Sequence, residues 1–336
     1  MFISQAIPLI MTAMDAHQPV MLMGSTGIGK SDLGHQLAKM RKVDLIDIRL
    51  AQYESVDLRG CPDIQNKRTV WNIPEIMPTK GKGIFFIDEL NQADQYVQAA
   101  AYQLILDRRL GNYELPVGWE ILAAGNRLTD QAIVQPMGTA LKNRFGHITI
   151  ETDHASWHAW AVPNGIHQFI TGFLRFKPIL LNQLDESTYK PHEIKATQNE
   201  NAFATPRTWA KLSNLLNIDD SKHRVFDYAM MMVGKGAATE FQSYVNMTAN
   251  LPAIEDILNG SVRRPDFDAP GLLISICAGL SQQASKSNFA AATQYVSHMD
   301  PEYQSMFMRD MILRDEGFDA TSTFTQWAVK NTAFNL

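Results

Sequence analysis

The sequence predicts an α/β domain built on a parallel sheet, followed by a helical region. Three observations predict it. A glycine-rich loop lies between a short apolar run and a segment of helical periodicity, two later apolar runs end in polar residues, and the character of the chain changes near residue 152. The 336 residues, of which 45% are hydrophobic, suffice for two domains, which we place at residues 1–152 and 153–336.

The glycine-rich loop fits the pattern G-x-x-x-x-G-K-[ST]. In this pattern small residues let backbone N–H groups surround a phosphate, the lysine reaches the terminal phosphates, and the hydroxyl binds Mg²⁺. Residues 20–23 before it read as a buried strand and residues 32–40 as a helix, so the loop ends at a helix N-terminus, where phosphates bind. The alternative is an ordinary glycine-rich turn. The predicted phosphate-binding residues are Gly24, Ser25, Thr26, Gly27, Ile28, Gly29, Lys30 and Ser31.

Further elements of the first domain follow from periodicity. Residues 2–15 predict an amphipathic helix, and residues 43–48 predict a second strand, which begins a parallel sheet. From residue 51 to residue 82 the periodicity fails, although residues 69–73 read as one arm of a hairpin. Because such an insertion often carries function, Trp71 either contacts a partner or packs under a loop.

A second apolar run, residues 83–87, ends in the carboxylates Asp88 and Glu89. A parallel sheet presents ligands at the carboxyl ends of its strands, so Asp88 is placed to orient the water shell of Mg²⁺. Glu89 is placed to act as general base on the attacking water. Two acids after an apolar strand can also be a helix cap and a surface charge, but the glycine-rich loop favours the functional interpretation.

A third apolar run, residues 119–125, ends in Asn126. This amide either holds the attacking water or the γ-phosphate, or caps the next helix. Before it, residues 92–110 show a helical stripe, and residues 110–117 hold a Gly-Asn turn typical of a projecting hairpin. Residues 147–150 read as the last strand of the domain.

The second domain reads as helical. Residues 156–181 show interrupted helical periodicity, and residues 184–202 are polar enough for a loop. His154 and His158 are spaced i, i+4, but they lack the acidic partner of a zinc-binding helix, so we favour a half-buried helix face over a metal site. Further helices are predicted over residues 204–216, 271–283 and 302–313.

The composition argues against several classes of protein. A formal net charge of −5 and a pI near 6.0 give no overall reason to expect duplex DNA as a partner. Cys61 and Cys277 are too few and too far apart for a disulfide framework or a thiolate metal site, which fits a reducing cytoplasm. No apolar run approaches the ~18–20 residues that span a bilayer, and residues 1–14 lack the basic start of a secretory signal. We therefore expect a soluble, cytoplasmic protein with no membrane partner.

The ordered motifs resemble those of an AAA+ ATPase. More narrowly, they resemble the MoxR-like and dynein-related branch, whose members carry a helix-2 insertion and a hairpin before sensor 1. Residues 51–82 and residues 110–118 lie where those two insertions would be. The resemblance covers residues 1–216. Its motifs are the loop at residues 24–31, Asp88-Glu89, Ala124-Gly125-Asn126, Asn143-Arg144-Phe145 and Thr205-Pro206-Arg207.

The resemblance implies roles for the residues at the sheet edge. Lys30 and the loop backbone bind the phosphates of ATP, and Ser31 and Asp88 hold Mg²⁺. Glu89 is the catalytic base, and Asn126 is sensor 1.

The resemblance also assigns two arginines. It implies that Arg144 acts in trans as an arginine finger and that Arg207 is sensor 2 on the lid. Charge accumulates on the γ-phosphoryl oxygens in the transition state, where a guanidinium offers paired donors worth roughly 10³–10⁵ in rate. The alternative for Arg144 is a surface ion pair after a helix over residues 138–143. The alternative for Arg207 is a place in the first turn of a helix over residues 206–216.

For the whole protein the resemblance implies a ring-shaped homo-oligomer, a hexamer, with ATP between neighbouring subunits. MoxR-like ATPases commonly remodel or activate a protein client, often with a separate protein that bears a von Willebrand factor A domain. A second hypothesis is a nucleic-acid motor or the nucleotide-driven subunit of a restriction system, which needs a basic stripe on the hairpins. A third, a nucleotide-gated scaffold, is disfavoured by Glu89. The basic residues available for a stripe are Lys67, Arg68, Lys80, Lys82, Arg108 and Arg109.

Overall fold

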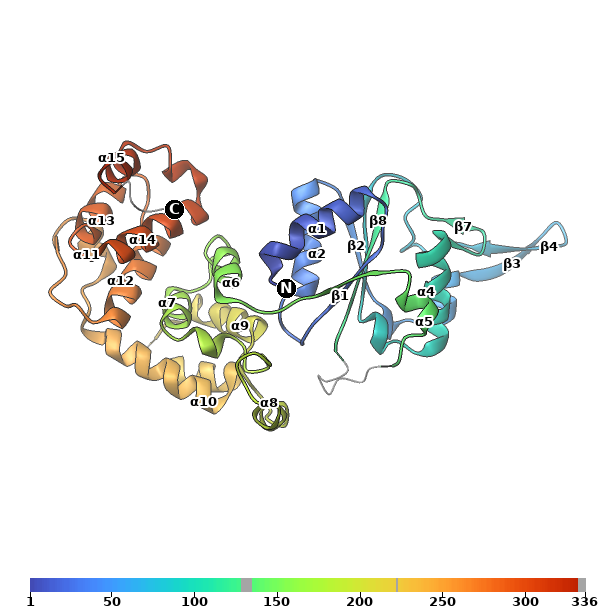
Figure 1. The fold of residues 1–336 in the computed structure, drawn as a ribbon, viewed down its shortest axis with the longest axis horizontal. Helices are drawn as coiled ribbons and strands as arrows, with labels where there is room; N and C mark the ends of the chain where they lie inside the picture. Colours follow the sequence, from blue (N-terminus) through green and yellow to red (C-terminus); the bar gives the residue numbers. More distant parts are fainter. Residues whose placement is uncertain (128–134, 222, 332–336) are drawn as a thin grey trace. The chain divides into compact units, whose positions relative to one another are not determined.

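The computed structural model describes residues 1–127, 135–221 and 223–331. The chain divides into two compact units, Met1–Thr152 and Asp153–Leu336. Figure 1 shows the first unit as a layered arrangement of sheet and helices, and the second as an assembly of helices. Among the helices of these described ranges, none combines the length and the apolar character needed to cross a membrane.

The first unit is built on a five-stranded sheet with the strand order β2-β5-β8-β1-β9, and all neighbouring strands run parallel. The central strands β5 and β8 are buried along their whole length, as expected for strands covered by helices on both faces. The predicted fold class, a parallel-sheet α/β core followed by a helical region, is confirmed. The strands are β1 (Val20–Met23), β2 (Asp44–Arg49), β5 (Gly83–Asp88), β8 (Trp119–Gly125) and β9 (Gly146–Thr149).

Helices cover both faces of this sheet because its strands alternate apolar side chains between them. Ile84 and Phe86 belong to a core shared with α1 (Ile3–Asp15) and α2 (Lys30–Arg41). Phe85 and Ile87 belong to the opposite core, which contains the apolar stripe of the predicted helix at residues 92–110. The structure places that helix, α4, at Gln95–Asp107 and a short helix, α5, at Thr139–Lys142.

The insertion at residues 51–82 contains a short helix and a hairpin. The expected hairpin arm is confirmed: β3 (Cys61–Gln65) pairs with β4 (Arg68–Asn72), and Figure 1 shows this ribbon extending away from the sheet. Gly60 joins α3 (Ser55–Arg59) to the ribbon with φ +82°, and a Cβ there would lie 1.9 Å from the carbonyl oxygen of Asn72. Trp71 is half-buried opposite Pro62, between the two predicted extremes.

The second expected hairpin also forms. It consists of β6 (Arg109–Leu110) and β7 (Tyr113–Glu114), joined by a turn at Gly111, which has φ +59°. Its base is anchored, because the Tyr113 hydroxyl donates to the carbonyl oxygen of Pro78 at 2.7 Å. This hairpin is therefore fixed against the insertion that precedes β5.

The second unit contains two apolar cores. The first joins α6 (His154–Ala161), α7 (Gln168–Phe176), α9 (Pro206–Leu216) and α10 (Val225–Met247), where Trp209 and Phe173 are buried. The helices predicted over residues 204–216, 271–283 and 302–313 are confirmed within one residue at their first and last positions, except that α9 begins two residues late. The second core joins α11 (Ile254–Leu258), α12 (Pro270–Gln283), α13 (Phe289–Val296), α14 (Pro301–Arg314) and α15 (Ser322–Lys330).

The loop predicted over residues 184–202 is wrong in part, because it contains α8 (Pro191–Gln198). The helix starts at a proline, and the Glu193 carboxylate accepts from the backbone N–H of Lys190 at 2.8 Å. Ile194 is its one buried residue. The helix is thus specified by its N-terminal signals and not by an apolar stripe, which is why periodicity missed it.

Three polar side chains, the buried His158 and Asp310 and the half-buried Arg175, link the two cores of the second unit. Arg175 of α7 donates to both carboxylate oxygens of Asp310 on α14, at 2.7 and 2.9 Å. The Nε2 atom of His158 on α6 lies 2.9 Å from the same carboxylate. His154 is half-buried and stacks on His158 with ring centroids 5.5 Å apart. His158 is thus engaged by hydrogen-bonding partners within the fold.

Candidate nucleotide-binding site

The glycine-rich loop connects β1 to α2, and its glycines are required by the backbone. Gly27 and Gly29 have φ values of 77° and 96°, which glycine adopts at little cost. At Gly24 a Cβ would lie 2.8 Å from the carbonyl oxygen of Ile150. The loop leads directly into the first turn of α2, where backbone N–H groups lack helical partners and attract anions.

Lys30 lies at the centre of the site. Its side chain is buried, and its ammonium group donates to the carbonyl oxygens of Gly24 and Ser25 at 2.7 and 2.8 Å. It also donates to Oδ1 of Asn126 at 2.9 Å. The ammonium therefore joins the loop to the carboxyl end of β8, so two of the predicted site residues from different strands meet at one point.

Ser31 and Asp88 form the second junction. The Ser31 hydroxyl donates to Oδ2 of Asp88 at 2.6 Å, and Oδ1 of Asp88 accepts from the backbone N–H of Glu89 at 2.8 Å. A hydroxyl and a carboxylate are hard oxygen donors, and Mg²⁺ takes few protein ligands while keeping several waters. The pair therefore fits Mg²⁺, and the residues predicted to hold it are in contact.

Glu89 has an unusual backbone for a residue other than glycine. Its φ is 56°, in the left-handed region, where a side chain of this size costs energy. The side chain is half-buried, and among the described residues its carboxylate has no hydrogen-bond or ion-pair partner. This left-handed backbone therefore presents, beyond the end of β5, a carboxylate that no other described residue binds.

Asn91 is a site residue that sequence reasoning missed. Its side chain is buried, its amide donates to the carbonyl oxygen of Asn126 at 2.7 Å, and its Oδ1 accepts from the Asn126 N–H at 3.2 Å. A Cβ on Gly125 would lie 2.3 Å from the same oxygen. Asn91 thus fixes the end of β8. The only available signal was a polar residue in the short segment between β5 and α4.

Arg127 also lies at this edge, where its guanidinium donates to the Ser25 hydroxyl. It joins the loop to the end of β8 beside the Lys30 contact. The alternative role of Asn126 as a cap of a following helix concerns residues 128–134, which lie outside the described residues.

A further carboxylate, Asp47, lies near Asp88. Burial raises the pKa of Asp47 on β2, and the charge of Asp88 on the neighbouring strand raises it further. His35, 3.5 Å from Asp47, acts in the opposite direction on that pKa. Concentrated negative charge on this side of β2 and β5 favours a cation.

Arg144 is not part of this site in its own chain. It is exposed and lies two residues before β9. Gly146 pairs with Val20 at the start of β1, whereas the glycine-rich loop follows Met23 at its end. At ~3.3 Å per strand residue, the length of β1 separates Arg144 from the phosphate-binding loop by roughly 10 Å or more. The two features therefore lie at opposite ends of the neighbouring parallel strands β1 and β9.

Arg207 lies in the second unit. It is exposed in the first turn of α9, after Thr205, whose hydroxyl accepts from the N–H of Thr208 at 3.2 Å. A helix that starts in this way presents the arginine at its N-terminal end.

Residues 19–145 match the sequence model of a protein family, the AAA domain of the dynein-related subfamily. The first unit carries a dynein-related AAA domain. The matched range contains the glycine-rich loop, both carboxylates after β5, and both hairpins. The chain is accordingly a P-loop ATPase.

Comparison with curated proteins gives no match. Solved structures give loose likenesses. A candidate ATPase from Cytophaga hutchinsonii has 16% identity and a TM-score of 0.36 over 99% of this chain and 89% of its own. The RuvB Holliday junction branch migration motor of Thermotoga maritima is 14% identical with a TM-score of 0.38, over 99% of this chain and 94% of its own. NtrX of Brucella abortus, in complex with ADP, is 10% identical with a TM-score of 0.37, over 98% of this chain and 67% of its own. Likenesses this loose support no statement about the function of this AAA domain.

Proposed function

We propose that this chain is a MoxR-like AAA+ ATPase that assembles into a cytoplasmic ring, a hexamer, and remodels or activates a protein client together with a von Willebrand factor A domain protein. One observation carries the proposal. The phosphate-binding loop and Arg144 lie at opposite ends of the neighbouring strands β1 and β9, which favours an arginine that completes the site of another subunit. Such an arrangement makes hydrolysis depend on assembly.

The residues at the sheet edge divide the work of hydrolysis. The loop backbone and Lys30 bind the triphosphate, and Ser31 with Asp88 would hold Mg²⁺, which neutralises charge on the phosphates. Glu89 accepts the proton of the water that attacks the γ-phosphorus as the bond to ADP breaks. Asn126, held by Lys30, orients that water or the γ-phosphate.

The two arginines connect hydrolysis to movement in this proposal. Arg144 of a neighbour stabilises the charge on the γ-phosphoryl oxygens, and Arg207 reports the state of the nucleotide to the second unit as sensor 2. Both are exposed, as groups that act across a boundary must be. Hydrolysis then moves the helical lid, residues 153–336, against the core, and the two hairpins transmit the movement.

The hairpins suit a protein client better than a nucleic acid. Two of the six basic residues that a DNA-binding stripe would need are engaged within the fold. The Arg108 guanidinium donates to the carbonyl oxygens of Pro116 and Trp119, and Arg109 pairs with Glu114 at 3.1 Å. The ribbon β3–β4 instead exposes an apolar side chain at its far end, since Ile64 is 80% exposed.

Trapping of the client tests the proposal. The Glu89→Gln variant should bind ATP and hydrolyse it slowly, so that partners stay bound and can be isolated and identified by mass spectrometry. We expect a protein partner that is captured with ATP and lost with ADP. Lys30→Ala, which loses phosphate contacts, is the matched control and should capture none. Capture of nucleic acid alone, with DNA-stimulated hydrolysis that falls steeply with salt, would overturn the client assignment.

A further inference from the structure

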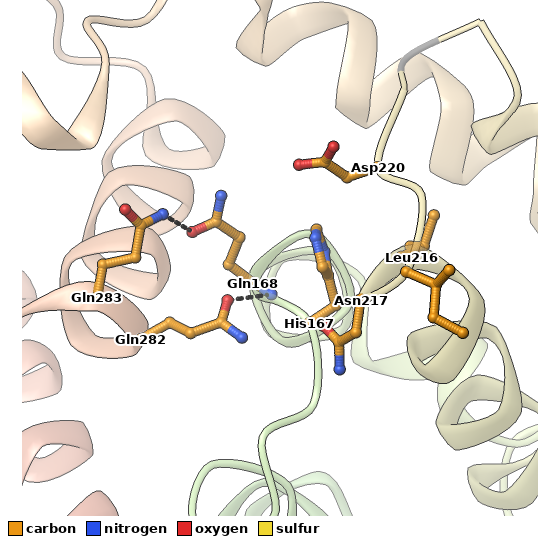
Figure 2. A pocket seen from close by; sticks show the side chains of 8 residues that line it. His167, Gln168, Leu216, Asn217, Asp220, Gln282 and Gln283 are labelled. Atoms are coloured by element: carbon orange, nitrogen blue, oxygen red, sulfur yellow. Dashed lines mark hydrogen bonds between the residues drawn. The ribbon is translucent and has the colours of Figure 1, made fainter.

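The second unit contains a polar pocket of about 420 Å³, a volume typical of small-ligand sites. Figure 2 shows it between the start of α7, the end of α9 and the end of α12. It lies wholly within the second unit and is separate from the nucleotide-binding site. Its lining residues are His167, Gln168, Leu216, Asn217, Ile218, Asp220, Gln282 and Gln283.

His167 supplies a fixed hydrogen-bond donor to this pocket. The residue is 6% exposed, and its backbone N–H donates to the Ser213 hydroxyl at 2.8 Å. Its Nδ1 atom accepts from the N–H of Phe169 at 3.2 Å, so the proton of the neutral ring is on Nε2. Burial lowers the pKa of His167 to about 4, although the negative charge of Asp220 acts to raise it. Because the pKa is this low, the ring is neutral at pH 7. Among the described residues Nε2 has no hydrogen-bond partner.

Two glutamine side chains add donors beside His167. The backbone N–H of Gln168 donates to Oε1 of Gln282 at 2.9 Å, and Nε2 of Gln283 donates to Oε1 of Gln168 at 3.1 Å. Figure 2 shows both bonds. The amide oxygens of Gln168 and Gln282 are thereby engaged, and their NH₂ groups remain as donors on the pocket wall. These bonds also occupy the first free N–H groups of α7, so helix-terminal anion binding does not explain the pocket.

Asp220 supplies the only charge in the lining. It follows α9 and lies on another wall from the glutamines, as Figure 2 shows. Within the described part of the chain its carboxylate has no ion pair or hydrogen bond. The pocket therefore presents one exposed carboxylate, that of Asp220, and on other walls three neutral donors: Nε2–H of His167 and the NH₂ groups of Gln168 and Gln282. A complementary ligand has a cationic donor beside an oxygen acceptor.

We propose that this pocket binds an ammonium group together with the carbonyl or carboxylate oxygen next to it, as presented by a free α-amino acid or by the amino terminus of a peptide. The ammonium meets Asp220, and the oxygen accepts from His167 and the glutamine amides. Isolated anions lack a partner for Asp220, and simple amines leave the buried donor of His167 unsatisfied. The site is independent of the proposed client remodelling and of the nucleotide chemistry.

Saturation-transfer NMR on the full chain tests the ligand class and its source. The probes are three matched sets: common L-amino acids, their C-terminal amides, and the N-acetylated amides. Binding of free amino acids identifies that source, and preferential binding of the amides identifies a peptide amino terminus; either result supports the proposal. Binding of none, or equal binding of the N-acetylated set, would overturn it, because acetylation removes the ammonium group.

Variants locate the binding. Asp220→Asn should weaken the affinity of the bound probe at least tenfold, and Gln282→Ala should weaken it by a smaller factor. Asp227→Asn, an exposed acid outside the pocket, is the matched control and should bind as the wild type does. All three should hydrolyse ATP at the wild-type rate, which shows that they fold and separates this test from that of the nucleotide site. Unchanged affinity in Asp220→Asn would contradict the proposal.

Discussion

Two regions of the molecule use acidic side chains for opposite purposes. At the edge of the sheet in the first unit, Glu89 presents a carboxylate without a partner in the described fold, on a strained backbone. In the second unit, Asp310 is buried, and both of its oxygens accept bonds from Arg175, with His158 beside them. The first group is available to a ligand, whereas the hydrogen-bonding capacity of the second is filled by the protein itself.

The comparison separates catalytic from structural charge. A buried acid that is surrounded by cationic donors stabilises the arrangement of the helices that carry them. An acid that is left free beside a phosphate-binding loop is costly unless a substrate uses it. Substitutions in the two regions should therefore change different quantities: the rate of hydrolysis in the first unit and the free energy of unfolding in the second.

The largest expected effect is that of Glu89→Gln on hydrolysis. Because the amide cannot accept a proton, steady-state turnover of ATP should fall by about 10²–10⁴-fold. Stability should be unchanged, since the carboxylate makes no bond in the described structure. Glu75→Gln, an exposed acid of the same unit, is the control. A Glu89→Gln protein that retains more than a third of wild-type turnover would remove Glu89 from the mechanism.

Asp310→Ala should have the largest effect on stability. It leaves the half-buried Arg175 and the buried His158 without their acid, and breaking a buried pair in this way typically costs about 3–5 kcal/mol of unfolding free energy. Urea denaturation followed by circular dichroism measures it. The double variant Arg175→Met with Asp310→Leu removes both charges and should recover much of the loss. If Asp310→Ala unfolds at the wild-type urea concentration, the network is not structural.

Stability should also fall in mild acid. Burial lowers the pKa of His154 to about 4, so the folded state takes up its proton at lower pH than the unfolded state, whose value is near 6.5. The stabilisation is therefore present above pH 6.5 and is lost as the pH falls, by about 2 kcal/mol between pH 7 and pH 5. Denaturation at these two pH values measures it, and His154→Leu should reduce the dependence by this amount while leaving the part that His167, whose pKa is also about 4, contributes. Equal pH dependence in both proteins would contradict this account of the histidine.

Asp310 contributes in a lower pH window. Burial disfavours its charge, but bonds from His158 and Arg175 outweigh this effect and hold the pKa of the carboxyl group at about 2. The contribution of the Asp310 carboxylate to the free energy of unfolding is complete above pH 3.8 and is lost as the pH falls toward 2. Acid titration of the wild type should therefore show a second loss of stability below that of His154.

The smallest effect is expected at an exposed ion pair. Arg109 and Glu114 are 59% and 67% exposed in their side chains, so solvent screens their attraction. Arg109→Ala should change the unfolding free energy by less than about 1 kcal/mol and leave turnover unchanged. A larger loss, measured by the same urea titration, would mean that the hairpin depends on this pair.

Sequence reasoning recovered the features that local chemistry fixes. The glycines at residues 24–31 reveal a phosphate-binding loop, and fully apolar runs reveal β5 and β8, because strands buried on both faces need such residues. It missed Asn91, whose importance lies in a contact with Asn126 across 35 positions. It also missed the pairing of His158 with Asp310, which are 152 positions apart. Long-range pairing of polar groups leaves no periodic signal.

The central claim is that neighbouring subunits complete each other's ATP sites. Mixing two inactive variants tests it most directly. The Arg144→Ala subunit keeps the base in its own ATP site but gives its neighbour no arginine. The Glu89→Gln subunit gives its neighbour the arginine but has no base in its own ATP site. Lys142→Ala, an exposed basic residue two positions before Arg144 at the end of α5, should stay fully active and serves as the control.

In a randomly mixed ring at equal amounts, about a quarter of the sites combine an intact base with an intact arginine. Turnover should therefore rise to about a quarter of the wild-type rate, where each variant alone is nearly inactive. A mixture no more active than its components, or an Arg144→Ala protein that hydrolyses ATP at the wild-type rate alone, would contradict the claim.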